Sequence, residues 1–258
     1  MKTTVKTISA QKGVSKISMI TAYDAVFASL ADRAGTDIIL VGDSLGNTVL
    51  GFESTVPVSM KMMLHHTAAV ARATKNALVL ADIPFAVAHK KFDSLLKNAS
   101  ALVQKAGANA VKIEGGRKMA KKISKLTDAG IAVMAHIGLE PQQVLKLGGY
   151  RKFGKTEEEK QRLIEDAKIL EQAGAFALLL EMTDFDVAEE ITRTISIPTI
   201  GIGSGVGCDG QVLVCTDILG LSENPPKFVK QYADLNKIIS EAYTSYIDDV
   251  KNSRFPQK

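Results

Sequence analysis

The stretch LVQKAGANAVKIEGG, residues 102–116, contains the unit from which the fold of this chain is built. It joins the end of an amphipathic segment to a glycine and then to a short apolar run, Ala110–Glu114. Gly107 can adopt the left-handed backbone conformation that ends many helices, because glycine has no Cβ atom. The stretch therefore predicts a helix, a glycine stop and a strand, in that order.

The same unit recurs along the chain. Three further phrases close an amphipathic segment and precede an apolar run, namely Arg33-Ala34-Gly35, Asp128-Ala129-Gly130 and Gln172-Ala173-Gly174. The apolar runs that can form strands number eight, and they are Ile17–Tyr23, Asp37–Asp43, Ala77–Asp82, Ala110–Glu114, Ile131–His136, Ala175–Glu181, Ile197–Gly203 and Gln211–Asp217. Nearly all are continuous rather than alternating, as parallel strands covered by helices require.

Helical patterns lie between most of these runs. Apolar residues recur at three-to-four spacing in Met60–Thr74, Phe92–Lys105, Arg117–Thr127, Glu157–Gln172 and Val187–Thr194. Strands alternating with helices over 258 residues predict an α/β fold, a (β/α)8 TIM barrel, rather than an open doubly wound sheet, because such barrels have ~250 residues. We expect a single domain, 1–258, in which the connection Ser204–Gly210 is too short for a helix.

One more amphipathic helix is predicted near the end of the chain, between Phe228 and Val250, where apolar residues keep a helical period for several turns. We expect this extra C-terminal helix to pack on the outer wall of the barrel or on a sister subunit. A helix that binds a different partner is the alternative.

Composition and charge exclude several classes of protein. The chain has 32 Lys+Arg against 28 Asp+Glu, a net charge of +4, and 46% hydrophobic residues, so it can bury a core. The basic excess is small and scattered, and the absence of Trp weakens any case for nucleic-acid binding. Two cysteines, Cys208 and Cys215, fit a reducing compartment. We expect a soluble cytoplasmic protein without a membrane-spanning segment.

Polar residues gather where the predicted strands end, which is where barrel enzymes build their active sites. These residues are Tyr23-Asp24, Asp43-Ser44, Asp82, Lys112 with Glu114, His136 and Glu181. Alternation puts Ile39, Val41 and Asp43 on one face of their strand. If that face points inward, Asp43, Asp82 and Glu114 come from three neighbouring strands and form a site for a hard cation such as Mg²⁺. The alternative is that these acids cap helices or pair with nearby Lys and Arg.

Three other strand-end residues have distinct expected roles. Lys112 is better suited to bind an anion than to form a Schiff base, because the neighbouring acids stabilise its charged form. Glu181 follows three leucines and has no cation beside it in sequence, so a raised pKa and a role as general base are expected, with helix capping as the alternative. His136 is expected either to hydrogen-bond a substrate or to orient a neighbour.

The glycine-rich loop Gly201–Gly210 follows the seventh predicted strand, the usual place for a phosphate site in a barrel. Such a loop is a weak signal by itself. It fits equally well a close backbone approach by a flat cofactor or by a neighbouring subunit.

Seven phrases occur in order along most of the chain: MITAYD (19–24), VGDSLG (41–46), ADIPF (81–85), VKIEGG (111–116), HIGL (136–139), GGY (148–150) and the segment 197–214 with its CDGQ. On these motifs the chain resembles the ketopantoate hydroxymethyltransferase family. The resemblance implies a (β/α)8 fold, usually assembled as a homodecamer, and the first committed step towards pantothenate.

The resemblance also implies residue roles. Asp43 and Asp82 would bind Mg²⁺, Glu114 would lie at the metal, Ser44 and Lys112 would hold the carboxylate of the 2-oxo acid, and Glu181 would act as base. Asp43, Asp82 and His136 are also expected to line the substrate site. In the implied reaction a Mg²⁺-stabilised enolate of 3-methyl-2-oxobutanoate attacks the one-carbon unit of 5,10-methylenetetrahydrofolate.

Three places depart from the family pattern and bear on the folate side of the site: Ala86-Val87-Ala88-His89, Lys152-Phe153-Gly154 and Cys215-Thr216. Two other functions are compatible with the residues. One is a Mg²⁺-dependent carbon–carbon lyase or a phosphonopyruvate-type mutase on a similar barrel. The other is a barrel without catalysis that serves as a scaffold.

Overall fold

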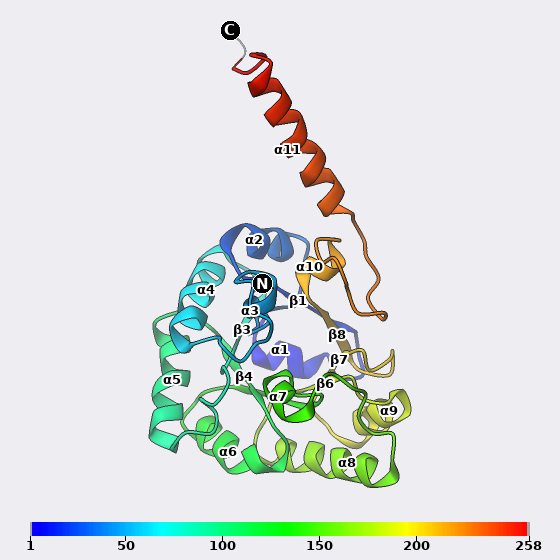
Figure 1. The fold of residues 1–258 in the computed structure, drawn as a ribbon. Coiled ribbons are helices and arrows are strands. Elements are labelled where there is room, and N and C mark those ends of the chain that lie inside the picture. Colours follow the sequence, from blue (N-terminus) through cyan, green and yellow to red (C-terminus); the bar gives the residue numbers. More distant parts are fainter. Residues whose placement is uncertain (1, 257–258) are drawn as a thin grey trace. The chain divides into compact units, whose positions relative to one another are not determined.

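The computed structural model of the protein describes residues 2–256 (Figure 1). The chain divides into two compact units, Met1–Val212 and Leu213–Lys258. The expectation of a single domain over 1–258 stays a prediction. No helix in the described part of the chain is long and apolar enough to cross a membrane.

The first unit contains the barrel. Its strands pair in chain order, from β1 to β8, into a closed parallel sheet, which confirms the predicted (β/α)8 architecture. The strands are β1 (Ile17–Thr21), β2 (Ile38–Val41), β3 (Leu78–Asp82), β4 (Ala110–Glu114), β5 (Val133–Gly138), β6 (Ala177–Glu181), β7 (Thr199–Ile202) and β8 (Gly210–Leu213).

Helices surround the strands (Figure 1). The first unit contains α1 (Val5–Ala10), α2 (Ala25–Arg33), α3 (Leu45–Thr48), α4 (Met60–Ala73), α5 (Phe92–Gln104), η1 (Arg117–Met119), α6 (Ala120–Asp128), η2 (Pro141–Gln143), α7 (Val144–Leu147), α8 (Glu157–Gln172) and α9 (Phe185–Thr194). The predicted glycine stops are confirmed, because Gly35, Gly107, Gly130 and Gly174 all have φ between 81° and 89°.

The second unit contains α10 (Cys215–Ile218) and α11 (Leu235–Lys251). The predicted C-terminal helix is thus present, but residues 228–234 are not part of it. It begins after Asp234, whose side chain accepts a hydrogen bond from Lys237 N at 3.1 Å. Its packing partner stays a prediction. The eighth predicted strand was too long, because Cys215-Thr216-Asp217 starts α10, where Leu219 N bonds to Cys215 O.

The inward face of β2 differs from the prediction by one residue. Ile38 and Leu40, not Ile39 and Val41, belong to the apolar core inside the barrel. The parallel register, which pairs Ile38 with Leu78 and Leu40 with Leu80, places these side chains in the same layers. Asp43 therefore enters the site from the turn after β2 and not from the strand itself.

The connection from β7 to β8 contains no helix over residues 203–209, as predicted. Close packing against α9 leaves no room for a Cβ atom at two of its glycines: one at Gly205 would lie 2.9 Å from the Phe185 ring, and one at Gly207 would lie 2.8 Å from Glu189 Cβ. This packing accounts for those two glycines.

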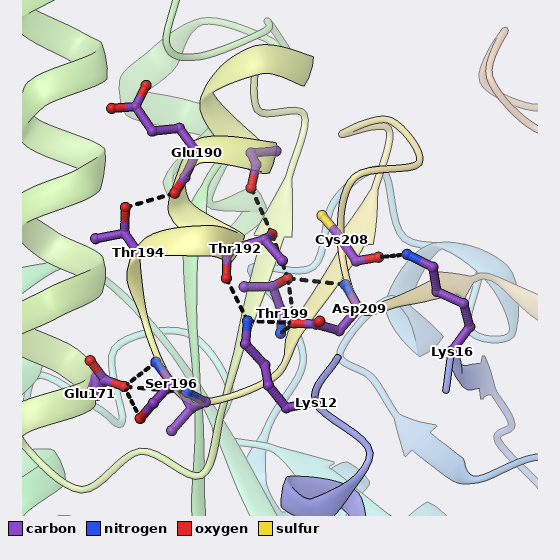
Figure 2. A network of polar contacts seen from close by, with 12 residues as sticks. Lys12, Lys16, Glu171, Glu190, Thr192, Thr194, Ser196, Thr199, Cys208 and Asp209 are labelled. Carbon is purple, nitrogen blue, oxygen red and sulfur yellow. Dashed lines mark hydrogen bonds and ion pairs between the residues drawn. The ribbon is translucent and has the colours of Figure 1, made fainter. Parts of the chain in front are cut away.

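A polar network ties the sheet together at the amino ends of its strands (Figure 2). Asp209, just before β8, accepts hydrogen bonds through Oδ2 from Thr199 N at 2.9 Å and from Lys12 Nζ at 2.8 Å. Lys12 Nζ also donates to Thr192 O at 2.5 Å. Since Lys12 precedes β1 and Thr199 opens β7, Asp209 joins the first strand of the barrel to the last two.

Replacing Asp209 by alanine is expected to lower the free energy of unfolding by about 2–4 kcal/mol, because the variant removes the carboxylate partner of a partly buried ammonium and leaves a strand N–H without its acceptor. Chemical denaturation measures this loss. The control is Glu165→Ala, which removes an exposed ion pair with Arg117 and should cost less than about 1 kcal/mol. Equal losses in the two variants would contradict the role assigned to Asp209.

Candidate active site

Charged side chains converge inside the barrel at the carboxyl ends of β3 to β6. Asp82 on β3 stands opposite Lys112 on β4 in the parallel register, and Glu114 stands opposite His136 on β5. All four side chains are buried. Glu181 ends β6 opposite Gly138, and its side chain is 20% exposed. The sequence-predicted residues on these strands are therefore brought together.

The side chains form a continuous row of contacts. Lys112 Nζ lies 2.8 Å from Asp82 Oδ1, 3.7 Å from Glu114 Oε1 and 3.2 Å from His136 Nδ1. His136 Nε2 lies 3.3 Å from Glu181 Oε2. The row therefore runs from a carboxylate through an ammonium and an imidazole to a second carboxylate.

Asp43 and Ser44 reach this row from the turn after β2. Asp43 N donates to Asp82 Oδ2 at 2.9 Å, which fixes the turn against β3. Gly42 leaves the space for this approach, since a Cβ atom there would lie 2.7 Å from Ser44 Oγ and 3.5 Å from Asp82 Oδ2. Ser44 Oγ lies 2.8 Å from the hydroxyl of Tyr23, which follows β1.

The acidic groups repel one another in this buried space. Burial, reinforced by the charge of Asp82, raises the pKa of Asp43 to about 7. Burial also raises the pKa of Glu114 well above its usual range, and the Lys112 ammonium offsets only part of that rise. More acidic groups are thus gathered here than one lysine can keep ionised.

Lys112 and His136 hold opposite protonation states. Burial alone lowers the pKa of Lys112, but Asp82, Glu114 and Asp43 outweigh it, so that the net shift is upward and the group stays an ammonium. This state disfavours Schiff-base chemistry, as expected from the sequence. Burial, followed by the charge of Lys112, lowers the pKa of His136 well below its usual range, so its imidazole is neutral.

The neutral tautomer of His136 follows from its neighbours. The Lys112 ammonium can only donate, so His136 Nδ1 accepts from it and the ring proton is on Nε2. That Nε2–H is buried and has no regular hydrogen bond within residues 2–256, although Glu181 Oε2 is 3.3 Å away. An unsatisfied buried donor beside a carboxylate is suited to meet an oxygen atom of a substrate.

Glu181 has the properties of a base that works near neutral pH. Burial raises its pKa to about 7, and the charge of Lys112 counters only part of the effect. The backbone around it is closely packed: a Cβ atom at Gly138, where φ is 96°, would lie 2.2 Å from Glu181 O. The backbone from which this side chain extends is therefore fixed by the pairing of β5 with β6.

Two residues near this site were missed by sequence reasoning. Gln142, in η2, is buried and donates through Nε2 to Asp43 Oδ2 at 2.7 Å. Tyr150 is close enough for its pKa to be raised by burial and then by the charges of Glu181, Asp43 and Glu114. Tyr150 lies in the GGY phrase, which was a usable signal, whereas a glutamine in a loop carries no pattern of its own.

The donor set fits a hard divalent cation in its chemistry, because Asp43, Asp82 and Glu114 supply buried carboxylate oxygens that repel one another. Asp82 Oδ1 also lacks a regular hydrogen bond, although Lys112 is nearby. In the described part of the chain, however, no three His, Cys, Asp or Glu side chains are already arranged around a common metal position. Here the Lys112 ammonium lies among the acids, and the metal assignment stays a prediction.

A cavity of about 220 Å³ adjoins the cluster where β5 ends, lined by Ile137, Gly138 and Glu140 together with residues of α8. A second cavity of about 660 Å³ borders the turn after β4, from Gly115 to Met119. Neither of these two cavities is lined by Asp43, Asp82, Glu114 or Glu181.

A (β/α)8 barrel with a carboxylate, a neutral imidazole and an ammonium at the carboxyl ends of its strands has the features of the class of barrel enzymes that act on small anionic molecules. The family model described as ketopantoate hydroxymethyltransferase matches residues 2–258. The chain belongs to this family, which confirms the resemblance seen in the sequence and the prediction of a hydroxymethyl transferase.

Relatives named 3-methyl-2-oxobutanoate hydroxymethyltransferase match over almost the full length. The protein from Caldivirga maquilingensis is 53% identical over 99% of this chain and 96% of its own length. The protein from Staphylothermus marinus is 52% identical over 100% of this chain and 94% of its own length. The protein from Thermococcus kodakarensis is 54% identical over 99% of this chain and 89% of its own length.

Solved structures support the fold alone. A phosphoenolpyruvate phosphomutase from Streptomyces platensis subsp. rosaceus superposes with a TM-score of 0.64 at 16% identity, covering 97% of this chain and 88% of that one. A 2,3-dimethylmalate lyase superposes with a TM-score of 0.63 at 17% identity, covering 100% and 90%.

Proposed function

We propose that the protein transfers a hydroxymethyl group from 5,10-methylenetetrahydrofolate to 3-methyl-2-oxobutanoate and forms ketopantoate for pantothenate biosynthesis. The observation that carries the proposal is Glu181, a carboxylate with a pKa of about 7, placed next to the unsatisfied donor of His136 at the mouth of the barrel. The names of the relatives supply the substrate and the product.

The charged row can bind the 2-oxo acid. Lys112 is the cation, and Ser44 supplies a hydroxyl, for the carboxylate of the substrate. His136 Nε2–H can donate to its keto oxygen. Asp43, Asp82 and Glu114 would hold Mg²⁺, which when bound would stabilise negative charge that develops on that keto oxygen.

Glu181 performs the acid–base step. It removes the proton from C3, and the electron pair released forms the new bond between C3 and the methylene carbon of the folate while the first C–N bond of that carbon breaks. Water then displaces the second folate nitrogen from the methylene carbon and leaves its hydroxyl group there. The proton from C3 and the proton from water end on the two folate nitrogens of the released tetrahydrofolate, so the atoms balance. A neutral His136 helps here, because an imidazolium beside Glu181 would lower the pKa of the base.

The rate of this proton transfer should depend on pH in one direction. Because Glu181 has a pKa of about 7 and only the carboxylate form accepts a proton, kcat/KM is expected to fall about tenfold per unit as pH drops well below 7. Initial rates between pH 5 and pH 9 with saturating Mg²⁺ measure this limb. A rate that stays constant down to pH 5 would exclude Glu181 as the base.

The proposed function is tested with purified protein, both substrates and Mg²⁺. Ketopantoate formation that requires each of the three components supports it. Product from the oxo acid alone would favour a lyase or a mutase instead, and no product under any of these conditions would favour a scaffold. Assembly as a homodecamer and a cytoplasmic location remain predictions.

A further inference from the structure

A buried glutamine, Gln142, reaches the site from the turn after β5, and no role for it was predicted from the sequence. Gln142 lies in η2, directly after β5, with its side chain almost completely enclosed. The turn is fixed on both sides: Leu139 N donates to Glu181 O at 2.8 Å, and Gln143 N donates to Glu140 O at 2.8 Å. Pro141 further restricts the backbone at this point.

The side-chain amide of Gln142 uses both of its N–H groups. Nε2 donates to Asp43 Oδ2 at 2.7 Å and to the backbone oxygen of Ile83 at 2.9 Å. Both partners are acceptors, so the amide nitrogen, and not the oxygen, must face them. Asp43 follows β2 and Ile83 follows β3, so one amide ties the turns after two neighbouring strands.

The backbone of Gln142 holds a second carboxylate. Gln142 N donates to Glu114 Oε2 at 3.1 Å. The other oxygen of Glu114, Oε1, faces Lys112 and His136 at 3.7 Å each. Gln142 thus donates a hydrogen bond to one oxygen of each of two carboxylates, and it does not bond to the second oxygen of either.

We propose that Gln142 is a positioning residue that restricts the rotation of the Asp43 and Glu114 carboxylates by binding one oxygen of each, and so leaves the other oxygen of each for a divalent cation. The inference rests on the proposed function, which places the cation at these acids. A neutral amide is suited to the task, because it orients Asp43 against the repulsion of Asp82 without neutralising the charge that attracts a metal. A lysine or arginine in its place would compete with the cation.

The test is the affinity of the folded protein for Mn²⁺, measured by titration calorimetry. Gln142→Leu keeps the approximate volume and the backbone N–H but removes both side-chain donors. Its dissociation constant for Mn²⁺ is expected to rise about 10–100-fold, the usual effect of losing a partner that orients a metal ligand. Gln143→Leu is the matched control, since the Gln143 side chain bonds to Glu140 and not to the cluster, and its affinity should not change.

Gln142→Asn repeats the test if the leucine variant does not fold. Its amide is one methylene shorter and cannot reach both acceptors, so weaker Mn²⁺ binding is again expected. A purely structural role predicts a lower melting temperature with unchanged affinity, which would overturn the inference and leave the proposed function in place. Failure of the wild-type protein to bind Mn²⁺ would overturn both.

Discussion

Replacing Glu181 by glutamine is expected to reduce kcat for ketopantoate formation by about 10²–10⁴-fold, because the variant keeps the shape of the side chain but cannot accept a proton. The KM for the oxo acid should change little, since Lys112 and Ser44, and not Glu181, are assigned to the substrate carboxylate. Steady-state kinetics at pH 8 with saturating folate and Mg²⁺ measure both constants.

At alkaline pH, Glu181→Gln should be more stable than the wild-type protein. A stable but inactive variant shows that activity is lost with the base and not by unfolding. The pKa of Glu181 is about 7 in the folded protein against an ordinary 4.5, so ionisation disfavours the folded state. That cost is absent below about pH 4.5, grows as the pH rises towards 7, and is fully present above it. Glutamine cannot ionise, so Glu181→Gln should gain thermal stability relative to wild type at pH 8 and not at pH 4.5.

Replacing Lys112 by methionine is expected to have the second large effect. Its ammonium is the cation in contact with Asp82 and Glu114 in the buried row. Removing it leaves those acids uncompensated, and breaking a buried ion pair in this way costs about 3–5 kcal/mol. The oxo acid also loses its cationic partner, so its KM should rise by at least about tenfold.

Urea denaturation and steady-state kinetics measure these two effects separately. Lys168→Met, on the exposed face of α8, is the control and should change neither quantity. A Lys112→Met protein with wild-type stability and wild-type KM would show that the ammonium neither compensates the acids nor binds the substrate.

The barrel was predictable because its signals are local. Each glycine stop fixes where a helix ends, and a continuous apolar run follows it. Which side chains of β2 point into the barrel was not predictable. Every residue of Ile38–Val41 is apolar and buried, so the strand shows no alternation that would distinguish its two faces. The end of the eighth strand was predicted wrongly for a different reason. Cys215-Thr216-Asp217 is a short run of mixed polarity, which is compatible with both a strand end and a helical turn.

The part of the site that could be predicted from the sequence is formed by residues at the ends of strands. Asp82, Glu114 and Glu181 could be placed by the rule that parallel strands deliver their last residues to one rim. Gln142 could not, because its function depends on contacts with residues 28, 59 and 99 positions away in the chain. Only the folded turn after β5 brings its amide to the acids.

Hydrogen–deuterium exchange at C3 of 3-methyl-2-oxobutanoate, in D₂O and without folate, isolates the proton transfer on which the whole account depends. We predict that the wild-type protein catalyses this exchange in the presence of Mg²⁺, and that Glu181→Gln loses it while still binding the oxo acid. Undiminished exchange in Glu181→Gln would contradict the assignment of Glu181 as the base that removes the C3 proton.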